Sequence, residues 1–207
     1  MRENDVAQAL PLWINGHAFL TVTPVFQDVL DPLSRKVLRR IPLCGFDEVQ
    51  MATSAAQAAF ASWASLSARA RAALLAAVGG ALEDYSAHFA ALITEESGKE
   101  STLALAEVDE SVALLNSSIA GADAGVVAII GNAAMPLLSV LHRAVPALLA
   151  GATLVVRPNP ETPSALFALA ELTARCGLPS GVFNIVHGGD EVADCLRAVQ
   201  AGRALDD

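Results

Sequence analysis

The residues best placed for chemistry stand in two short loops. Gly131-Asn132-Ala133-Ala134 follows the apolar run Val126 to Ile130, and Arg157-Pro158-Asn159-Pro160 follows a second apolar run that begins at Thr153. Both runs are short and rich in β-branched residues, as strands are when both of their faces are covered. In open α/β sheets, ligands bind beyond the carboxyl ends of the strands. These two loops are therefore the first place to look for a functional site.

The residues around the loops predict the elements that hold them. Pro136 to Ala150 is long enough for a helix, and Gly151 stands where a helix stop belongs. Strand, helix and strand together form a βαβ unit, which is nearly always right-handed. Val182 to Val186 predicts a third buried strand, followed by a turn at Gly188-Gly189-Asp190 and a last helix from Glu191 to Ala201. This part of the chain reads as three βα units, half of a doubly wound nucleotide fold.

The chain before these units predicts a hairpin and then helices. Apolar residues flank an Asn15-Gly16 turn, and a further strand is expected from Val37 to Ile41. Helices are expected from Asp47, from a cap at Ser67 and over Thr102 to Asn116; the second is expected to bend at Gly79-Gly80 and to end at Gly98. The carboxylates of the third helix are interpreted as its solvated face; they are Glu107, Asp109 and Glu110.

The expected fold class is α/β: a partial, doubly wound, Rossmann-like parallel sheet, preceded by a helical segment and a short N-terminal antiparallel hairpin. We place the N-terminal β segment at residues 1–46, the helical segment at 47–124 and the Rossmann-like half-domain at 125–207, all within one compact domain. With 207 residues, of which 54% are hydrophobic, the chain can bury a sizeable core.

Charge and hydropathy exclude several classes of function. The net charge is −9, and the largest basic cluster comprises four residues, Arg35, Lys36, Arg39 and Arg40, so nucleic acid is not an expected partner. The uncharged stretch Ala124 to Leu141 divides into a strand and a helix, which indicates buried core and no membrane span. Met1 to Asp5 is acidic and has no apolar run, so we expect no secretory signal and a cytoplasmic protein.

Cysteines and histidines give no sign of a metal or disulfide site. Cys44, Cys176 and Cys195 are odd in number and widely spaced, and the latter two fall within helical patterns that place them in the core. The four histidines show no pairing at metal-ligand spacing, so each is expected to be satisfied locally; they are His17, His88, His142 and His187. We therefore predict no metal.

The order of several motifs resembles the aldehyde dehydrogenase superfamily. Leu12-Trp13-Ile14-Asn15-Gly16 is similar to the family's opening "yINGxw", and Glu95-Glu96-Ser97-Gly98-Lys99 to its "leTGKp". The stretch from Pro146 to Pro158 resembles "PALaaGNtvVlKP", and Gly177 to Val186 resembles "GlPpGvlNvV". No single one of these motifs is enough to establish the resemblance. Their order and spacing, from Leu12 to about Ala201, make chance similarity very unlikely.

The resemblance implies aldehyde oxidation, in which a cysteine thiolate attacks the carbonyl and a hydride passes to NAD or NADP. The family's oxyanion donor, the Asn of "PWNFP", aligns with Ala134, which has no side-chain donor. Asn132 could replace it if the loop shifted; otherwise Asn132 caps or solvates the turn. The family's nucleophile and general base align beyond Asp207, and its segment between Glu107-Val108 and Gly125 is several dozen residues longer. We therefore assign no catalytic residue.

The resemblance also implies a cofactor site for NAD or NADP. By alignment, its candidate residues are Ile130, Gly131, Asn132, Arg157, Pro158 and Gly188. Arg157 aligns with a family lysine that bonds the adenosine ribose; it could hold a ribose or a 2′-phosphate, or it could be an exposed strand-end arginine. The motif's acidic residue aligns with Pro160, with Glu161 beside it as a substitute, and Asp190 is expected to repel a phosphate.

Three functions remain open. The chain could be part of a dehydrogenase, inactive alone; a non-catalytic structural or partner-docking domain, as in proline utilisation A flavoenzymes; or a residual NAD(P)-binding module. A partial sheet exposes an edge, so we expect a homo-oligomer or a protein partner to pair with that edge.

Overall fold

The computed structural model describes residues 7–21 and 25–201 of the chain. Met1 to Asp5, on which the secretory prediction rests, and the final Asp207 lie outside these residues. The strands are β1 (Leu12–Ile14), β2 (His17–Phe19), β3 (Phe26–Leu30), β4 (Val37–Pro42), β5 (Val126–Ile130), β6 (Thr153–Arg157) and β7 (Phe183–Ile185). The helices are α1 (Phe46–Ser65), α2 (Ala68–Asp84), α3 (Ser86–Ser97), α4 (Ser101–Leu115), α5 (Leu138–Ala150), α6 (Ser164–Arg175) and α7 (Asp190–Gln200).

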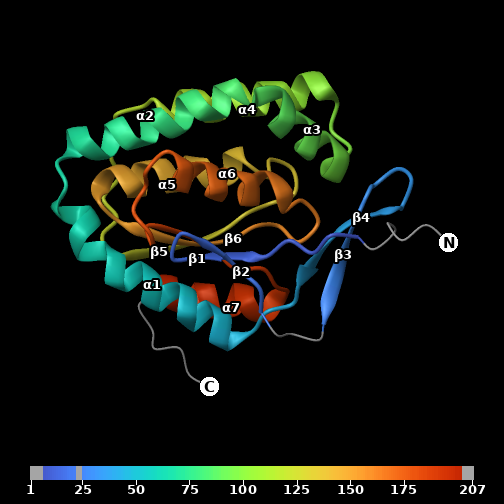
Figure 1. Ribbon diagram of the computed structural model, residues 1–207, viewed down its shortest axis with the longest axis horizontal. Helices are drawn as coiled ribbons and strands as arrows, with labels where there is room; N and C mark the ends of the chain where they lie inside the picture. Colours follow the sequence, from blue (N-terminus) through green and yellow to red (C-terminus); the bar gives the residue numbers. More distant parts are fainter. Residues whose placement is uncertain (1–6, 22–24, 202–207) are drawn as a thin grey trace.

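A five-stranded mixed sheet organises the described residues, in the order β2-β1-β7-β6-β5. β5, β6 and β7 are parallel, with Val126 opposite Thr153 and Leu154 opposite Phe183, as the predicted βα units require. The N-terminal hairpin joins the same sheet, because β1 pairs antiparallel with β7 through Trp13 and Ile185. β3 and β4 form a separate antiparallel ribbon, drawn in blue at one side of the molecule (Figure 1).

The predicted hairpin turn is confirmed at Asn15-Gly16. Both residues have positive φ, 55° and 77°, the backbone that a type I′ turn needs. The turn is also held to the parallel strands, because Asn15 N donates to Asn184 Oδ1 over 3.0 Å. The buried amide of Asn184 donates in turn to the carbonyl oxygens of Leu154 and Gly181. One side chain thus fixes the hairpin against β6 and β7.

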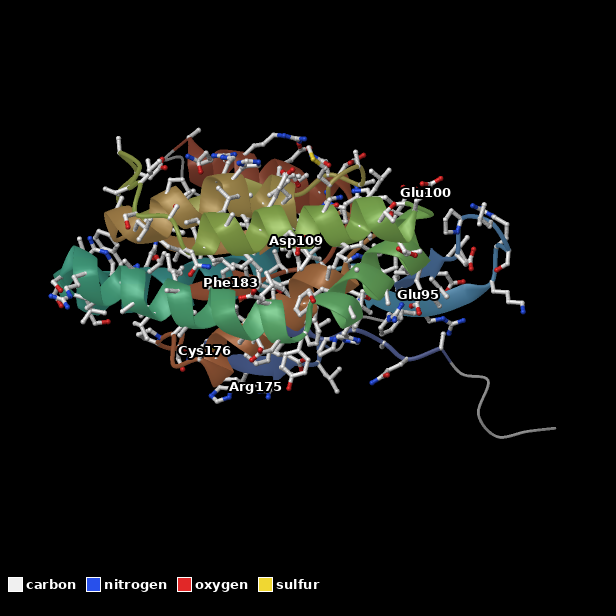
Figure 2. All side chains as sticks on the ribbon, turned by 90° about the horizontal axis from the view of Figure 1, so that it is seen from above. Glu95, Glu100, Asp109, Arg175, Cys176 and Phe183 are labelled. Atoms are coloured by element: carbon white, nitrogen blue, oxygen red, sulfur yellow. The ribbon has the colours of Figure 1, made fainter. Side chains whose placement is uncertain are left out.

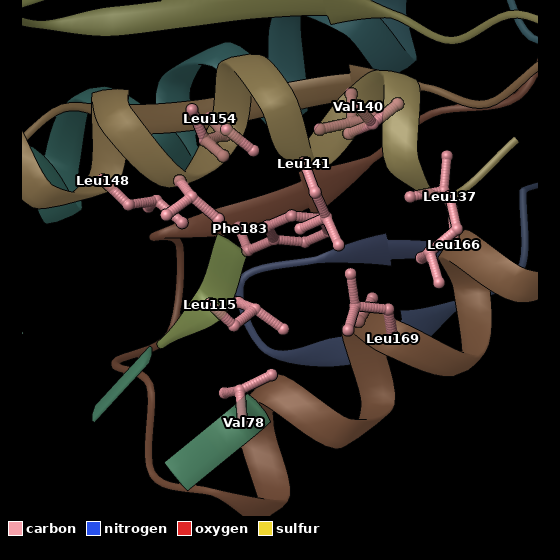
Figure 3. Packing of buried hydrophobic residues seen from close by; sticks show 14 of the residues in the cluster. Val78, Leu115, Leu137, Val140, Leu141, Leu148, Leu154, Leu166, Leu169 and Phe183 are labelled. Carbon is pink, nitrogen blue, oxygen red and sulfur yellow. The ribbon is translucent and has the colours of Figure 1, made fainter. Parts of the chain in front are cut away.

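Helices cover both faces of the sheet (Figure 1). α5 and α6 lie on one face beneath an outer layer of α2, α3 and α4, while α1 and α7 cover the other face. Figure 3 shows the larger core cluster, in which Leu154 and Phe183 of the strands meet Leu141 and Leu148 of α5. A second cluster on the opposite face joins Ala128 and Val155 to α1 and α7. The strand residues alternate between the two clusters, as a sheet buried on both faces requires.

The sequence analysis predicts the break in the second helix at the wrong position. The sequence predicts a bend at Gly79-Gly80, but α2 runs unbroken to Asp84, and a new helix begins after Tyr85. Gly79 is buried, and a Cβ there would lie 3.2 Å from Leu115 Cβ. Gly79 therefore allows close packing between α2 and α4, and it does not act as a hinge. The predicted cap at Ser67 and the helix end at Gly98 are confirmed.

The three-part division of the chain stays a prediction, although the three parts share contacts. β1 of the first part lies in the main sheet, and α1 of the second part packs against β6 and β7. Among the described residues, no helix combines the length and the apolar character needed to cross a membrane.

Candidate functional site

The loops that follow β5, β6 and β7 are bonded to one another. Gly131 N donates to Arg157 O over 2.9 Å, and Arg157 Nε donates to Gly188 O over 2.8 Å. The structure therefore brings the predicted loops together at the carboxyl ends of the parallel strands. These bonds engage the N–H of Gly131 and the Nε of Arg157 within the protein.

The two predicted glycines of these loops are explained by packing. A Cβ on Gly131 would lie 3.2 Å from Val140 Cγ2 and 3.3 Å from Asn159 N. A Cβ on Gly188 would overlap the side chain of Val192 and lie 3.1 Å from Cys44 O. Both positions require glycine because the backbone passes close to its neighbours, whether or not a ligand is bound.

Arg157 is buried, so the alternative of an exposed strand-end arginine is wrong. Only 7% of the residue is exposed. Burial lowers the pKa of its guanidinium, and the nearby carboxylate of Asp190 partly opposes that shift. Arg157 thus acts as a brace between the ends of β6 and β7. Pro158 beside it is buried, and neither Pro158 nor Ile130 has a polar side-chain group to offer.

This brace gives a prediction for Arg157→Met. Methionine keeps an unbranched apolar stem but leaves the Gly188 carbonyl without its donor, which costs about 1–3 kcal/mol of the free energy of unfolding. Urea titration measures the loss. Arg143→Met is the matched control, because Arg143 is exposed, and its change should stay within about 0.5 kcal/mol of zero. Equal stability of the two variants would contradict the bracing role.

Asn132 caps its own turn, which confirms that alternative of the sequence analysis. Its Oδ1 accepts from Met135 N over 2.9 Å, and Asn132 itself is exposed. Ala134, two residues later, is also exposed and carries no donor. In the next loop Asn159 does the same work, with its Oδ1 accepting from Glu161 N. Both loops therefore use their amides to hold their own shape.

Two buried glutamates reach these loops, and the sequence analysis missed both. Glu107, predicted to be solvated, is 4% exposed, and its Oε1 accepts from Leu137 N at 2.9 Å and from Leu138 N at 3.1 Å. Its Oε2 forms an ion pair with Lys99. Glu107 thereby satisfies the first amides of α5, a helix that has no side-chain cap of its own. The sequence offers no capping residue before α5, which could have indicated that a distant group caps this helix. It could not indicate that the group belongs to Glu107.

Glu96 plays the same part for α6. Its carboxylate accepts from Ser164 N over 3.0 Å, accepts a second hydrogen bond from the Ser164 hydroxyl, and pairs with Arg39. Burial raises its pKa, against the opposing effects of Ser164 and Arg39. By contrast, Asp109 and Glu110 are exposed as predicted, and Figure 2 shows Asp109 on α4 together with Glu95 and Glu100 near the start of that helix.

His187 lies directly before Gly188 and is 1% exposed. Its Nε2 lies 3.1 Å from Pro11 O, while its Nδ1 is buried and has no partner among the described residues. Burial lowers its pKa to about 4, with a smaller contribution from the charge of Arg157. The prediction of local satisfaction therefore holds for one ring nitrogen and fails for the other.

No thiol of the chain has the environment of a nucleophile. Burial raises the pKa of Cys44 to about 12, and burial also raises the pKa of Cys176 and of Cys195. Cys176 lies beside Arg175 at the end of α6 (Figure 2), and both Cys176 and Cys195 are half-buried against the core clusters. Among residues 7–21 and 25–201, no group of three His, Cys, Asp or Glu side chains could hold a metal.

Two of the predicted cofactor residues are engaged in contacts within the protein. Asn132 Oδ1 and Arg157 Nε are already bonded within the protein, and the remaining candidates carry no polar side chain. The N-terminus of α7, which follows Gly188, holds Asp190 and Glu191 in its first turn, where their charges oppose a phosphate. Four of the six predicted residues, Gly131, Asn132, Arg157 and Gly188, therefore take part in contacts that shape the loops, and a role in cofactor binding stays a prediction.

The fold and the loop arrangement are those of a nucleotide-type α/β half-domain, and comparison with known proteins identifies its family. The sequence profile of the aldehyde dehydrogenase family matches residues 23–124 and 122–204. The chain belongs to the aldehyde dehydrogenase family.

The similar proteins are longer than this chain. It is 29% identical over 204 residues to malonate-semialdehyde dehydrogenase of Bacillus velezensis, an alignment with 88% of this chain and 42% of that protein. It is 33% identical over 183 residues to succinate-semialdehyde dehydrogenase (NADP+) of Escherichia coli K12, with 78% and 38% covered. The chain spans less than half the length of the curated relatives it matches.

Comparison with solved structures supports the same family assignment. The lactaldehyde dehydrogenase of Escherichia coli superposes with a TM-score of 0.87 at 28% identity, over 92% of this chain and 45% of that one. A 3,6-anhydro-L-galactose dehydrogenase in complex with NAP superposes with a TM-score of 0.86 at 26% identity, over 96% and 46%. The predicted family and the α/β fold class are thus confirmed.

Proposed function

We propose that this chain alone does not oxidise aldehydes, and that it serves as a non-catalytic structural domain of the aldehyde dehydrogenase family. The observation that supports this most directly is the state of its three thiols. Each has its pKa raised by burial, whereas the attacking group in thiol catalysis is the thiolate. Cys44 lies beside the loop that follows β7, but its thiol donates to Pro42 O, and the nearby charge of Glu48 adds to the rise of its pKa.

The loops support the same proposal. A site that stabilises an oxyanion needs donors aimed at open space, and Ala134 has none to offer from its side chain. The side-chain oxygen of Asn132 accepts a hydrogen bond from Met135 N, so this side chain caps its own turn. A structural role is the function we favour for such a domain, since the loops at the strand ends are bonded to one another.

The proposal predicts that the purified chain forms no NADH or NADPH from an aldehyde. Succinate semialdehyde and lactaldehyde, taken from the names of the similar enzymes, are suitable substrates, and absorbance of the reduced cofactor measures turnover. The Escherichia coli succinate-semialdehyde dehydrogenase (NADP+) is the positive control in the same assay. Aldehyde-dependent reduction above the no-enzyme rate would overturn the proposal.

Calorimetry with NAD and NADP separates this function from the residual cofactor module. We expect no heat of binding at millimolar cofactor, because Arg157 is buried with its Nε bonded to Gly188 O and α7 begins with two carboxylates. Saturable binding without turnover would favour the cofactor module over the structural domain.

A further inference from the structure

The turn between β1 and β2 carries an asparagine that is followed by a glycine, Asn15-Gly16. The amide carbon of an asparagine side chain can be attacked by the backbone N of the next residue, which closes a cyclic succinimide and releases ammonia. Glycine is the most favourable next residue, because it has no Cβ to hinder ring closure. The turn therefore has a chemistry of its own that needs no bound ligand.

Asn15 differs from the other asparagines that the structure describes, because its side chain is free. The residue is exposed, and its backbone N donates to Asn184 Oδ1, but no hydrogen bond holds its side-chain amide. A bonded amide must give up its partner before its carbon can turn towards the next N. The side chains of the other described asparagines are all bonded within the protein; they are Asn116, Asn132, Asn159 and Asn184.

The attacking group is also free at this position. The N–H of Gly16 forms no hydrogen bond with any residue that the structure describes. The residue that follows each of the other described asparagines opposes ring closure, by lack of an N–H, by burial or by its Cβ; these residues are Pro160, Ile185, Ser117 and Ala133. Both reacting groups are therefore available at Asn15-Gly16.

The folded turn still holds these two groups apart. Asn15 and Gly16 have φ of 55° and 77°, and in this left-handed region the backbone directs Gly16 N away from the Asn15 side chain. The hairpin must therefore open before the ring can close. β2 pairs with β1 alone, and its residues His17 and Ala18 are exposed, so this opening costs far less than global unfolding.

We propose that Asn15 is a site of spontaneous deamidation, which proceeds through opening of the β1–β2 hairpin. In the opened turn, Gly16 N bonds to Asn15 Cγ, the bond from Cγ to the side-chain nitrogen breaks, and this nitrogen leaves as ammonia with the proton from Gly16 N. Water then opens the succinimide at either carbonyl and gives aspartate or isoaspartate. No group is oxidised or reduced.

Isoaspartate at this position is incompatible with the native hairpin. The main chain then runs through the former side chain and becomes one carbon longer. A two-residue turn can no longer place Ile14 opposite His17. The bond from Asn15 N to Asn184 is lost as the turn widens, and Asn184 is the side chain that fixes the hairpin against β6 and β7. The modification thus converts a transient opening into a permanent detachment of β2.

Peptide mass mapping tests the proposal after the folded chain is incubated in a slightly alkaline buffer. We expect Asn15 to react at least about tenfold faster than Asn116, an exposed asparagine with a bonded side chain, which corresponds to about 1.4 kcal/mol of barrier. A peptide of residues 11–20 should react faster still, because it has no hairpin to open. Equal rates at Asn116 and Asn15 would overturn the proposal, as would an intact Asn15 when the peptide is fully converted.

Two variants test the role of the hairpin. Asn15→Gly keeps a sequence that suits a type I′ turn and removes the reacting amide. With an isoaspartyl methyltransferase as the probe for isoaspartate, the aged wild type should be labelled at this turn and the aged variant should not. Hydrogen exchange in β1 and β2 should accelerate on ageing in the wild type alone. Unchanged exchange in a labelled wild type would overturn the detachment of β2.

Ala18→Thr strengthens β2 at an exposed position away from the reacting groups, so it should slow deamidation about threefold. An unchanged rate would mean that the reaction does not pass through the opened hairpin, which contradicts the proposed route. Gly16 itself is unsuitable for substitution, because a Cβ there would lie 2.6 Å from Ser180 Oγ.

Discussion

Lowering the pH from 6.5 to 4 is expected to cost this fold about 3 kcal/mol of its free energy of unfolding through His187 alone. The ordinary pKa of histidine, 6.5, applies to the unfolded chain, and burial lowers the folded value to about 4. At pH values between these two pKa values, the histidine is protonated in the unfolded state and neutral in the folded state. Stability from this group is therefore full above pH 6.5 and is lost as the pH falls towards 4.

The geometry explains why His187 resists protonation. Pro11 O can only accept a hydrogen bond, so Nε2 carries the proton of the neutral ring. Nδ1 is then a buried acceptor without a partner, and a second proton there would create a buried N–H with nothing to bond. The charge of Arg157 adds a smaller repulsion.

Urea titration of the wild type and His187→Gln from pH 7.5 to 4 measures this effect. The variant is expected to be less stable at neutral pH and to have a flatter pH dependence below 6.5. His142→Gln, at an exposed position, should run parallel to the wild type. Parallel curves for wild type and His187→Gln would contradict the assignment.

The sequence was a good guide wherever structure depends on near neighbours. The Asn15-Gly16 hairpin, the βαβ unit that ends at Arg157 and the cap of Asn132 on Met135 all follow from residues a few positions apart. The loops of the candidate site could likewise be placed, because strand ends in a parallel sheet meet at one edge.

The sequence was a poor guide wherever one side chain bonds a distant backbone. Arg157 bonds Gly188, 31 positions away, and so is a buried brace, whereas one alternative of the sequence analysis was an exposed cation. Glu96 reaches Ser164 over 68 positions. A carboxylate on a helix is usually solvated, and no local pattern distinguishes one that caps another helix. The prediction of a bend at Gly79 was also wrong because of a distant contact. The packing of α4 on α2 at this position explains the glycine.

Glu107 is expected to be the most sensitive carboxylate of the fold. Glu107→Ala would leave Leu137 N and Leu138 N without an acceptor and Lys99 without its partner, all within a buried region. Removing one member of a buried ion pair costs about 3–5 kcal/mol. Glu107→Gln keeps the oxygen that faces the two amides and loses the charge, so its cost should be smaller, about 2 kcal/mol.

Two measurements separate capping from a general loss of stability. Urea titration should rank Glu107→Ala below Glu107→Gln, with Glu110→Ala, an exposed neighbour on α4, close to the wild type. Hydrogen exchange at the amides of Leu137 and Leu138 should accelerate in Glu107→Ala more than elsewhere in α5. Those amides begin the helix that follows the Asn132 loop, so a carboxylate of α4 holds one wall of the candidate site in place. Equal exchange along all of α5 would mean that Glu107 stabilises the fold without acting as its cap.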